Sequence, residues 1–406
     1  MKNHSLNEGY DQKLFLKGGN GSKVFSSKKI YQDLSFGAGS LILGHSNIIQ
    51  QKCFNLFKKK KISLLAHPNL QANNFSNLLS KIFKEYPKFV FCSTGSEAVT
   101  KALRITKAIS RKNLIISVTG SWHGSVDKLL FKIKDMKNFP LSDGLSEQDS
   151  KNIKFIEYNN FEKSEKILKR FKKKISCIIV EPIQGCLPDE NSIKYIKFLF
   201  NFAKKNKIII IFDEMITGLR INGTSLQNYL NLVPDITIFG KGFGGGLPIG
   251  IIAVSKKIED QISKKNLKIF YGGTYSGNSF STLLAYETTK YINSNKKKII
   301  GQLNLKSKYF ENSINAFLNL KKLPAKIYRY HSMIRLVFSN LKIKNRTQRD
   351  FFEERNKNKI EKFRSFLETK NILYPKNGLI FLSSQTTKKD INYIIKNFKI
   401  ALEKFL

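Results

Sequence analysis

The chain has 406 residues, with 71 Lys and Arg residues against 30 Asp and Glu residues and a formal net charge of +41 at pH 7. The basic residues are spread along the whole chain, whereas a nucleic-acid-binding surface concentrates them on one face or in a tail. Composition therefore disfavours a nucleic-acid-binding protein and favours a large globular protein with lysines on its helix surfaces.

Targeting signals and metal sites are not indicated by the sequence. The first residues lack the apolar core of a signal peptide, and no apolar run reaches the length that spans a bilayer. The four cysteines, Cys53, Cys92, Cys177 and Cys186, have neither paired spacing nor nearby histidines. We therefore expect a cytoplasmic protein with reduced thiols, no metal centre and no membrane partner.

The first segment, residues 1–45, has short strand patterns around Lys23–Phe25 and Ile30–Tyr31, followed by a glycine-punctuated turn from Phe36 to His45. This pattern predicts an amino-terminal arm that joins a small domain.

Residues 46–300 alternate short apolar runs with helical patterns. Strands that are apolar throughout, separated by helices, are typical of a mostly parallel sheet that helices cover on both faces. We therefore expect an α/β fold with a large domain over residues 46–300. Its predicted strands are Phe89–Cys92, Leu114–Val118, Ile175–Val180, Ile208–Phe212, Ile236–Phe239 and Ile251–Val254.

Residues 301–406 predict a smaller α/β domain that follows a lysine-rich helical stretch, Asn293–Lys298. Its expected strands and helices are Ile334–Phe338, Leu379–Ser383, Arg349–Glu368 and Asp390–Phe405. Active sites of open parallel sheets lie at the carboxyl ends of the strands, so residues directly after the large-domain strands are the candidates for chemistry.

Gly95 and Ser96 follow a predicted strand and open a helix. The free backbone N–H groups and the positive end of the helix dipole favour an anion there, and Gly95 permits close approach. An ordinary capping box explains the same residues without a ligand, and this motif alone does not decide between the two.

Trp122 and His123 follow the next predicted strand. Trp122, the only tryptophan, can stack on a flat heterocycle, and His123 can polarise the site; the alternative is a tryptophan that packs in the core. Because this loop and the Gly95 loop should open on the same edge of the sheet, the site interpretation gains weight.

Asp213 and Lys241 carry the most specific signal. Asp213 ends a very apolar strand, where a buried carboxylate needs a cation, and Lys241 follows another strand among glycines that bring backbone close to a ligand. A lysine that forms a Schiff base and an aspartate that keeps a pyridine nitrogen protonated are what pyridoxal phosphate requires. The alternatives are a structural salt bridge or helix cap for Asp213 and a surface position for Lys241.

These motifs together resemble the class III pyridoxal-phosphate-dependent aminotransferases, most closely the glutamate-1-semialdehyde 2,1-aminomutase branch. The resemblance covers about residues 20–400 and rests on segments in family order. These are Leu43–His45, Ser93–Ala98, Ala102–Arg104, Trp122–Gly124, Val180–Gly185, Phe212–Arg220, Pro234–Asp235, Gly240–Gly246 and Gly273–Asn278.

The resemblance implies the transferase fold of type I and a homodimer with active sites at the subunit interface. It implies that Lys241 and Asp213 are catalytic, and that Thr274 reaches the cofactor phosphate of the neighbouring subunit. The implied cofactor is pyridoxal 5'-phosphate, and its expected binding residues are Gly95, Ser96, Trp122, His123, Glu181, Asp213, Met215, Lys241 and Thr274.

The sequence also departs from the aminomutase pattern around the substrate. We expect the chain to lack the amino-terminal segment with a carboxylate-binding arginine. A pocket aromatic is replaced in Gly37–Gly39, an asparagine is replaced by Cys186, and Tyr374–Gly378 lacks a glutamate. Ile216, in contrast, favours the aminomutase-like branch over ornithine-type members.

The resulting prediction is an aminotransferase that moves an amino group from a small-molecule donor to a keto or aldehyde acceptor. The alternatives are intramolecular amino transfer, as in the aminomutase, and a non-catalytic binding protein on the same fold.

Overall fold

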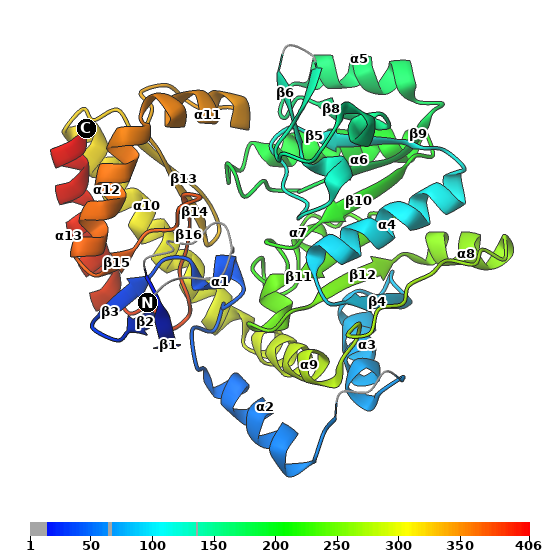
Figure 1. Ribbon diagram of the computed structural model, residues 1–406, viewed down its shortest axis with the longest axis horizontal. Helices are drawn as coiled ribbons and strands as arrows, with labels where there is room; N and C mark the ends of the chain where they lie inside the picture. Colours follow the sequence, from blue (N-terminus) through cyan, green and yellow to red (C-terminus); the bar gives the residue numbers. More distant parts are fainter. Residues whose placement is uncertain (1–13, 64–66, 135–136) are drawn as a thin grey trace.

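A seven-stranded sheet forms the centre of the computed structural model, which describes residues 14–63, 67–134 and 137–406 (Figure 1). Across the sheet the strands are β4 (Lys88–Cys92), β12 (Gly250–Val254), β11 (Ile236–Gly240), β10 (Ile209–Asp213), β9 (Ile175–Val180), β5 (Leu114–Val118) and β8 (Ile153–Ile156). The strands from β11 to β8 are parallel to one another, whereas β12 runs antiparallel to both β11 and β4. The predicted mostly parallel sheet is confirmed, and β8 is a strand that the sequence interpretation missed.

Helices cover both faces of this sheet, as the apolar strands predicted. Successive residues of β9 point to opposite sides: Ile179 packs beneath α4 (Gly95–Ser110), and Ile178 packs with residues of α6 (Ser192–Lys205). Since both faces of the strand are buried, nearly every strand position is apolar.

Strands from the amino-terminal and carboxyl-terminal parts of the described chain meet in one small sheet. Its order is β1 (Leu16–Asn20), β2 (Lys23–Ser26), β3 (Ile30–Asp33) and β15 (Ile372–Leu373), and β15 runs parallel to β3. The predicted strands at Lys23–Phe25 and Ile30–Tyr31 are thus confirmed. The boundaries predicted between domains, at residues 45 and 300, stay predictions.

A three-stranded antiparallel sheet lies beside it, with the order β13 (Lys326–Tyr330), β14 (Met333–Val337) and β16 (Leu379–Phe381). Behind this part of the chain pack α10 (Gln302–Leu320), α12 (Lys357–Thr369) and α13 (Lys388–Phe405), seen on the left of Figure 1.

The helix predicted over Arg349–Glu368 is wrong as one element. It is two helices, α11 (Arg346–Arg355) and α12, which meet at Asn356. The Asn356 amide donates hydrogen bonds to the carbonyl oxygens of Phe338 and Phe352, at 3.1 and 2.9 Å. An asparagine that bonds to nearby backbone in this way competes with helix continuation.

The remaining elements connect these layers. They are α1 (Phe36–Gly39), α2 (Ile48–Lys59), α3 (Leu70–Ile82), η1 (Asp127–Leu129), β6 (Phe131–Lys134), β7 (Lys137–Pro140), η2 (Glu147–Ser150), α5 (Phe161–Phe171), α7 (Leu226–Tyr229), η3 (Lys241–Gly244), α8 (Lys256–Lys264), α9 (Ser279–Ser294) and the π-helical turn η4 (Lys297–Gly301). None of the helices in the described residues has the length and apolar character needed to cross a bilayer.

Candidate active site

Asp213 is the last residue of β10, and its carboxylate is buried. One oxygen, Oδ2, lies 2.7 Å from Nδ1 of His123, and the other accepts the backbone N–H of Met215 at 3.1 Å. The His123 ring is also buried, and its Nε2 atom has no hydrogen-bond partner among the described residues. The predicted residues Asp213 and His123 therefore form one buried unit at the carboxyl ends of β5 and β10.

Lys241 follows β11 directly and adopts a φ of +40°, which is rare outside glycine. Residues held in such conformations cluster at functional sites because the surrounding structure must offset the strain. No hydrogen bond is found for its amine in the described part of the chain, and burial lowers the pKa of Lys241 while Glu181 and Asp213 oppose that shift. Lys241 is thus an amine kept close to two carboxylates without being tied to either.

The start of α4 leaves backbone donors free. Thr94 caps the helix by accepting the N–H of Glu97 at 3.2 Å, so the predicted capping is present. The N–H groups of Gly95 and Ser96 have no acceptor among the described residues. Capping and anion binding are therefore compatible at this helix, because the cap uses a different N–H group.

Close packing explains the glycines around this helix start. A Cβ at Gly124 would lie 2.3 Å from Oγ of Ser96, which already accepts the N–H of Ser125 at 2.9 Å. The Met215 side chain occupies the space beside Gly95 and Gly240, where a Cβ would lie 2.7 and 2.5 Å from its Cε. Met215 thus packs between the end of β11 and the start of α4.

Glu181 orients the loop that carries Trp122. Its carboxylate accepts the backbone N–H of Trp122 at 2.6 Å and that of Gly185 at 3.2 Å. Burial, reinforced by the charge of Asp213, raises the pKa of Glu181 to about 6. Trp122 is 52% exposed as a residue, so the alternative of a core-packed tryptophan does not hold.

Thr274 lies in the exposed loop between α8 and α9. The loop is fastened to the first turns of α4, because Ser276 Oγ lies 3.0 Å from a Glu97 oxygen and the Lys101 amine donates to the carbonyl of Tyr271. Exposed aromatic side chains flank Thr274, with Phe270 at 74% and Tyr275 at 65% exposure. These contacts place the loop that carries Thr274 beside the start of α4.

Two charged residues of the Phe212–Arg220 segment have structural surroundings that the sequence did not reveal. Glu214 accepts the N–H groups of Leu226 and Gln227 at the start of α7, and burial raises its pKa to about 7. Arg220 is fully buried, donates to the carbonyl of Gly39 and to Ser332 Oγ, and lies over the ring of Phe381. The Phe212–Arg220 motif identifies these two residues, but it does not reveal their partners, most of which lie elsewhere in the sequence.

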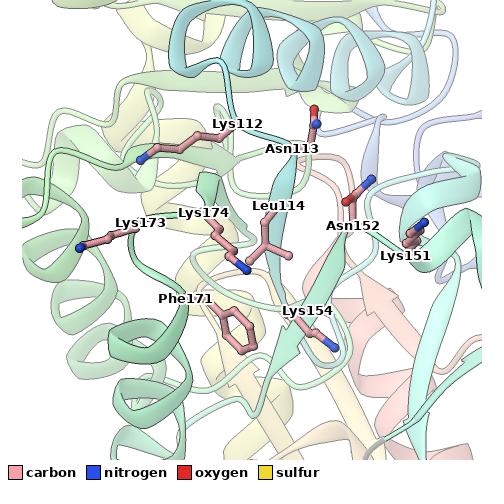
Figure 2. Close-up of a pocket in the computed structure, with 9 residues that line it drawn as sticks. All are labelled: Lys112, Asn113, Leu114, Lys151, Asn152, Lys154, Phe171, Lys173 and Lys174. Carbon is pink, nitrogen blue, oxygen red and sulfur yellow. The ribbon is translucent and has the colours of Figure 1, made fainter.

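A wide, basic pocket of about 470 Å³ lies elsewhere on the molecule (Figure 2). It sits at the amino ends of β5 and β8, around Leu114 and Phe171, and its basic residues are Lys112, Lys151, Lys154, Lys173 and Lys174. Because Asp213 and Lys241 lie at the carboxyl ends of their strands, this pocket is separate from the candidate active site.

The residues fit pyridoxal phosphate. A buried carboxylate can meet the pyridinium, an unpaired amine can meet the aldehyde, two free N–H groups can meet the phosphate, and an open indole can meet the ring face. The buried Nε2 of His123 supplies a further polar atom without a partner.

Comparisons with known proteins agree with this geometry. The family model "Aminotransferase class-III" matches residues 7–358. The chain is 30% identical to glutamate-1-semialdehyde 2,1-aminomutase of Methanosphaera stadtmanae over 96% of this chain and 92% of that protein. The corresponding enzyme of Wigglesworthia glossinidia brevipalpis is 33% identical over 77% of this chain and 72% of that protein.

Solved structures share the fold. An omega-transaminase from Sphaerobacter thermophilus matches with a TM-score of 0.88 at 17% identity, over 96% of this chain and 91% of that one. A glutamate-1-semialdehyde aminomutase from Pseudomonas aeruginosa matches with a TM-score of 0.86 at 17% identity, over 97% and 88%. The chain therefore belongs to the class III aminotransferases, a family of pyridoxal-phosphate-dependent enzymes.

Proposed function

We propose that the chain transfers an amino group from a small-molecule donor to a keto or aldehyde acceptor, with Lys241 and Asp213 as its catalytic residues. The observation that carries this proposal is the buried Asp213–His123 pair near the Lys241 amine, which has no hydrogen-bond partner among the described residues. When bound, pyridoxal phosphate supplies an electron sink for the bonds at the amino-bearing carbon.

In this proposal each side chain has a separate task. Lys241 holds the cofactor and then moves the proton at the amino-bearing carbon, for which the lowered pKa of its amine is suited. Asp213, oriented by His123, keeps the pyridine nitrogen protonated. Gly95 and Ser96 offer N–H groups to the phosphate, while Trp122 covers one face of the ring.

Glu181 and Met215 position these groups, on this account. Glu181 fixes the backbone of Trp122, and Met215 fills the space beneath Gly95. The sequence predicted that both residues bind the cofactor. In this proposal they act indirectly, by positioning the residues that contact it.

A second candidate is the aminomutase reaction. It is favoured by the curated relatives at 30% and 33% identity, which are glutamate-1-semialdehyde 2,1-aminomutases. It also agrees with Ile216, whose side chain forms an apolar wall beside Gly185.

We also propose a cytoplasmic homodimer in which Thr274 completes the active site of the other subunit. The exposed loop that carries Thr274, with exposed Phe270 and Tyr275, supports the subunit contact. The four free cysteines support a reducing compartment.

Product analysis separates the two candidate reactions. The cofactor-loaded protein is incubated either with glutamate-1-semialdehyde alone or with glutamate and a panel of keto and aldehyde acceptors. The proposal predicts 2-oxoglutarate and an aminated acceptor in the second incubation. Efficient formation of 5-aminolevulinate in the first, without turnover in the second, would establish the aminomutase instead.

A further inference from the structure

Lys101 lies in the second turn of α4 and is only 4% exposed. No other lysine of the described residues has so small an exposed fraction. The other lysines that pair with acids in this part of the chain keep side chains that are at least 36% exposed. A lysine is rarely buried unless its charge is compensated, so the contacts of Lys101 need an explanation.

All three donors of the Lys101 ammonium group are used. The group lies 2.5 Å from Oε1 of Glu97, one helical turn earlier, and donates to the carbonyl oxygen of Tyr271 at 2.6 Å. Its third contact is with Oγ of Ser276, at 3.4 Å. An ammonium group has three donors, so none is left for an outside ligand. Lys101 therefore acts on its neighbours in the protein, two of which belong to the loop that carries Thr274.

Glu97 joins this loop to the start of α4. Its Oε1 atom also lies 3.0 Å from Oγ of Ser276, and its Oε2 atom accepts the backbone N–H of Ser93 at 2.7 Å. Burial raises the pKa of Glu97, but its hydrogen bonds, above all the bond from Lys101, bring the pKa below its usual value. The group is therefore a carboxylate at neutral pH. One carboxylate thus holds both the strand end before Gly95 and the loop before α9.

Thr274 lies in a short turn of the loop. The N–H of Ser276 donates to the carbonyl of Gly273 at 2.9 Å, which closes a β-turn with Thr274 as its second residue. A Cβ at Gly273 would stand 2.9 Å from Oε1 of Glu97, so the first residue of the turn lies directly against the carboxylate. Ser276, the last residue of the turn, bonds to the same oxygen. Both ends of the turn are therefore held by Glu97.

Hydrophobic packing does not hold this turn in place, because residues 272–275 are exposed. Polar contacts with α4 continue on the other side of the turn, where Arg104 donates to the carbonyl of Phe270 at 2.6 Å. Helix residues three and four apart lie on the same face, so Glu97, Lys101 and Arg104 form one row along the loop. The position of the turn thus depends on charged side chains of α4.

We propose that Lys101 is a positioning residue for the cofactor phosphate. It holds Glu97 and the carbonyl of Tyr271, and thereby fixes the turn that offers the Thr274 hydroxyl to the phosphate in the neighbouring subunit. This inference rests on the homodimer and the role of Thr274 proposed above. It adds that the affinity of one subunit for pyridoxal phosphate depends on a buried lysine of the other, because a group that is ordered before binding loses less entropy on binding.

The test is a double-mutant cycle on the full chain. Equilibrium dialysis gives the dissociation constant of pyridoxal phosphate for the native protein, Lys101→Met, Thr274→Ala and the variant with both changes. We expect each single change to raise this constant by roughly 3- to 10-fold, the scale of one lost hydrogen bond or of ordering one loop segment. The double variant should bind no more weakly than Thr274→Ala, because Lys101 acts through Thr274.

The reaction rate of the fully loaded protein is a second readout. A lysine that only sets cofactor affinity leaves the chemistry unchanged. At saturating cofactor, Lys101→Met should therefore react with a donor amine at the native rate.

Lys265→Met is the matched control. Lys265 stands at the start of the same loop and also joins it to α4, because its amine donates to the carbonyl of Ile109 at 2.9 Å. This contact is at the opposite end of α4 from Glu97. The control variant should therefore keep the native dissociation constant for the cofactor.

Ser276→Ala covers the case in which Lys101→Met does not fold. It removes one bond to Glu97 and leaves the Glu97–Lys101 pair in place. It should weaken cofactor binding by roughly 2- to 3-fold, without a further loss when it is combined with Thr274→Ala.

The outcomes separate this inference from the proposed function. Losses of affinity that multiply in the double variant overturn the role of Lys101, as does a reduced rate of Lys101→Met at saturating cofactor. Native affinity in both Lys101→Met and Ser276→Ala also overturns it, while the role of Thr274 stands. Native affinity in Thr274→Ala overturns the proposed role of Thr274 and this inference with it. A native protein that binds no pyridoxal phosphate overturns the proposed function itself.

Discussion

Asp213 is the residue whose surroundings most directly constrain the chemistry. Its carboxylate is buried and shares a hydrogen bond with His123, so it enters the site as an oriented negative charge. The neighbouring acid Glu214 is buried in a different way, because its carboxylate accepts two backbone N–H groups. The two acids are adjacent in sequence, yet one holds α7 and the other faces the site.

We predict that Asp213→Asn slows amino transfer by about 10²-fold or more, the scale on which loss of an electrostatic stabiliser is felt. The shape of the side chain is kept, but the charge that holds the pyridine nitrogen protonated is lost. Single-turnover kinetics with a donor amine measures the rate, and cofactor content is measured alongside as the control. A rate equal to that of the native protein contradicts the assigned role.

Glu214 gives a prediction for stability against pH. Its pKa is raised from 4.5 to about 7 by burial, so between these values the folded state binds more protons than the unfolded state. Stability from this group is therefore present at low pH and is lost as pH rises toward 7. The difference of 7 − 4.5 corresponds to about 3 kcal/mol.

We expect Glu214→Gln to reduce the fall in the free energy of unfolding between pH 5 and pH 8 by about 3 kcal/mol, in order of magnitude. Urea unfolding at several pH values measures it. Comparing pH slopes removes any pH-independent cost of placing an amide at this position. If the free energy of unfolding changes with pH identically in the native protein and in Glu214→Gln, Glu214 is ionised throughout this range and the prediction is wrong.

At the scale of elements, the site depends on how closely the Trp122 loop approaches the start of α4. The contact between Gly124 and Ser96 leaves no room for a side chain. The strands β4 and β5 end at the same edge of the sheet, but β12, β11, β10 and β9 lie between them. The contact therefore depends on the loop after β5 reaching the start of α4.

Gly124→Ala should therefore weaken cofactor binding by about 10-fold and destabilise the fold by about 1–3 kcal/mol. The matched control is Gly144→Ala. Gly144 also has a positive φ, +84° against +78° for Gly124, but nothing lies within 4 Å of its would-be Cβ. Equilibrium dialysis with pyridoxal phosphate and urea unfolding measure the two effects. Equal losses of cofactor affinity and stability in the two variants would mean that backbone strain alone causes the effect, and not the contact with Ser96.

The sequence predicts elements well where both faces are buried. Strands β9, β10 and β11 are apolar at nearly every position, and their predicted ranges agree with the structure to within a residue. Strand β8 lies at the edge of the sheet and contains an exposed Lys154, so its four residues carried too little signal. The break at Asn356 depends on a bond to Phe338, and helical periodicity cannot contain that information.

In the candidate site, too, residues in local sequence motifs are predictable, whereas contacts between distant residues are not. Gly95, Asp213 and Lys241 are recognisable because each sits in a local motif directly after a strand. The surroundings of Arg335 involve Glu353, Asn377 and Gly378, which only tertiary folding brings together. Local motifs therefore predict the cofactor site, while the partners of a buried charged side chain such as Arg335 need the structure.

At the scale of the whole molecule, one chain combines a large sheet that carries the candidate site with smaller sheets built from both chain ends. Parallel pairing of β15 with β3 links the amino-terminal strands to the carboxyl-terminal part. Leu379 of β16 lies against Gly185, whose N–H is accepted by Glu181 of the large-sheet region, so the smaller sheets pack directly against the segment that follows β9.

The central claim is that Lys241 is the residue to which pyridoxal phosphate attaches. The measurement is reduction of the cofactor-loaded protein with borohydride, followed by proteolysis and mass spectrometry of the peptides. The account predicts a visible absorption band that reduction abolishes, and the cofactor mass on the peptide that contains Lys241. The variant Lys241→Ala should bind the cofactor without that covalent link and should have no turnover. Attachment of the cofactor to another lysine, or steady-state amino transfer by Lys241→Ala, would contradict the account.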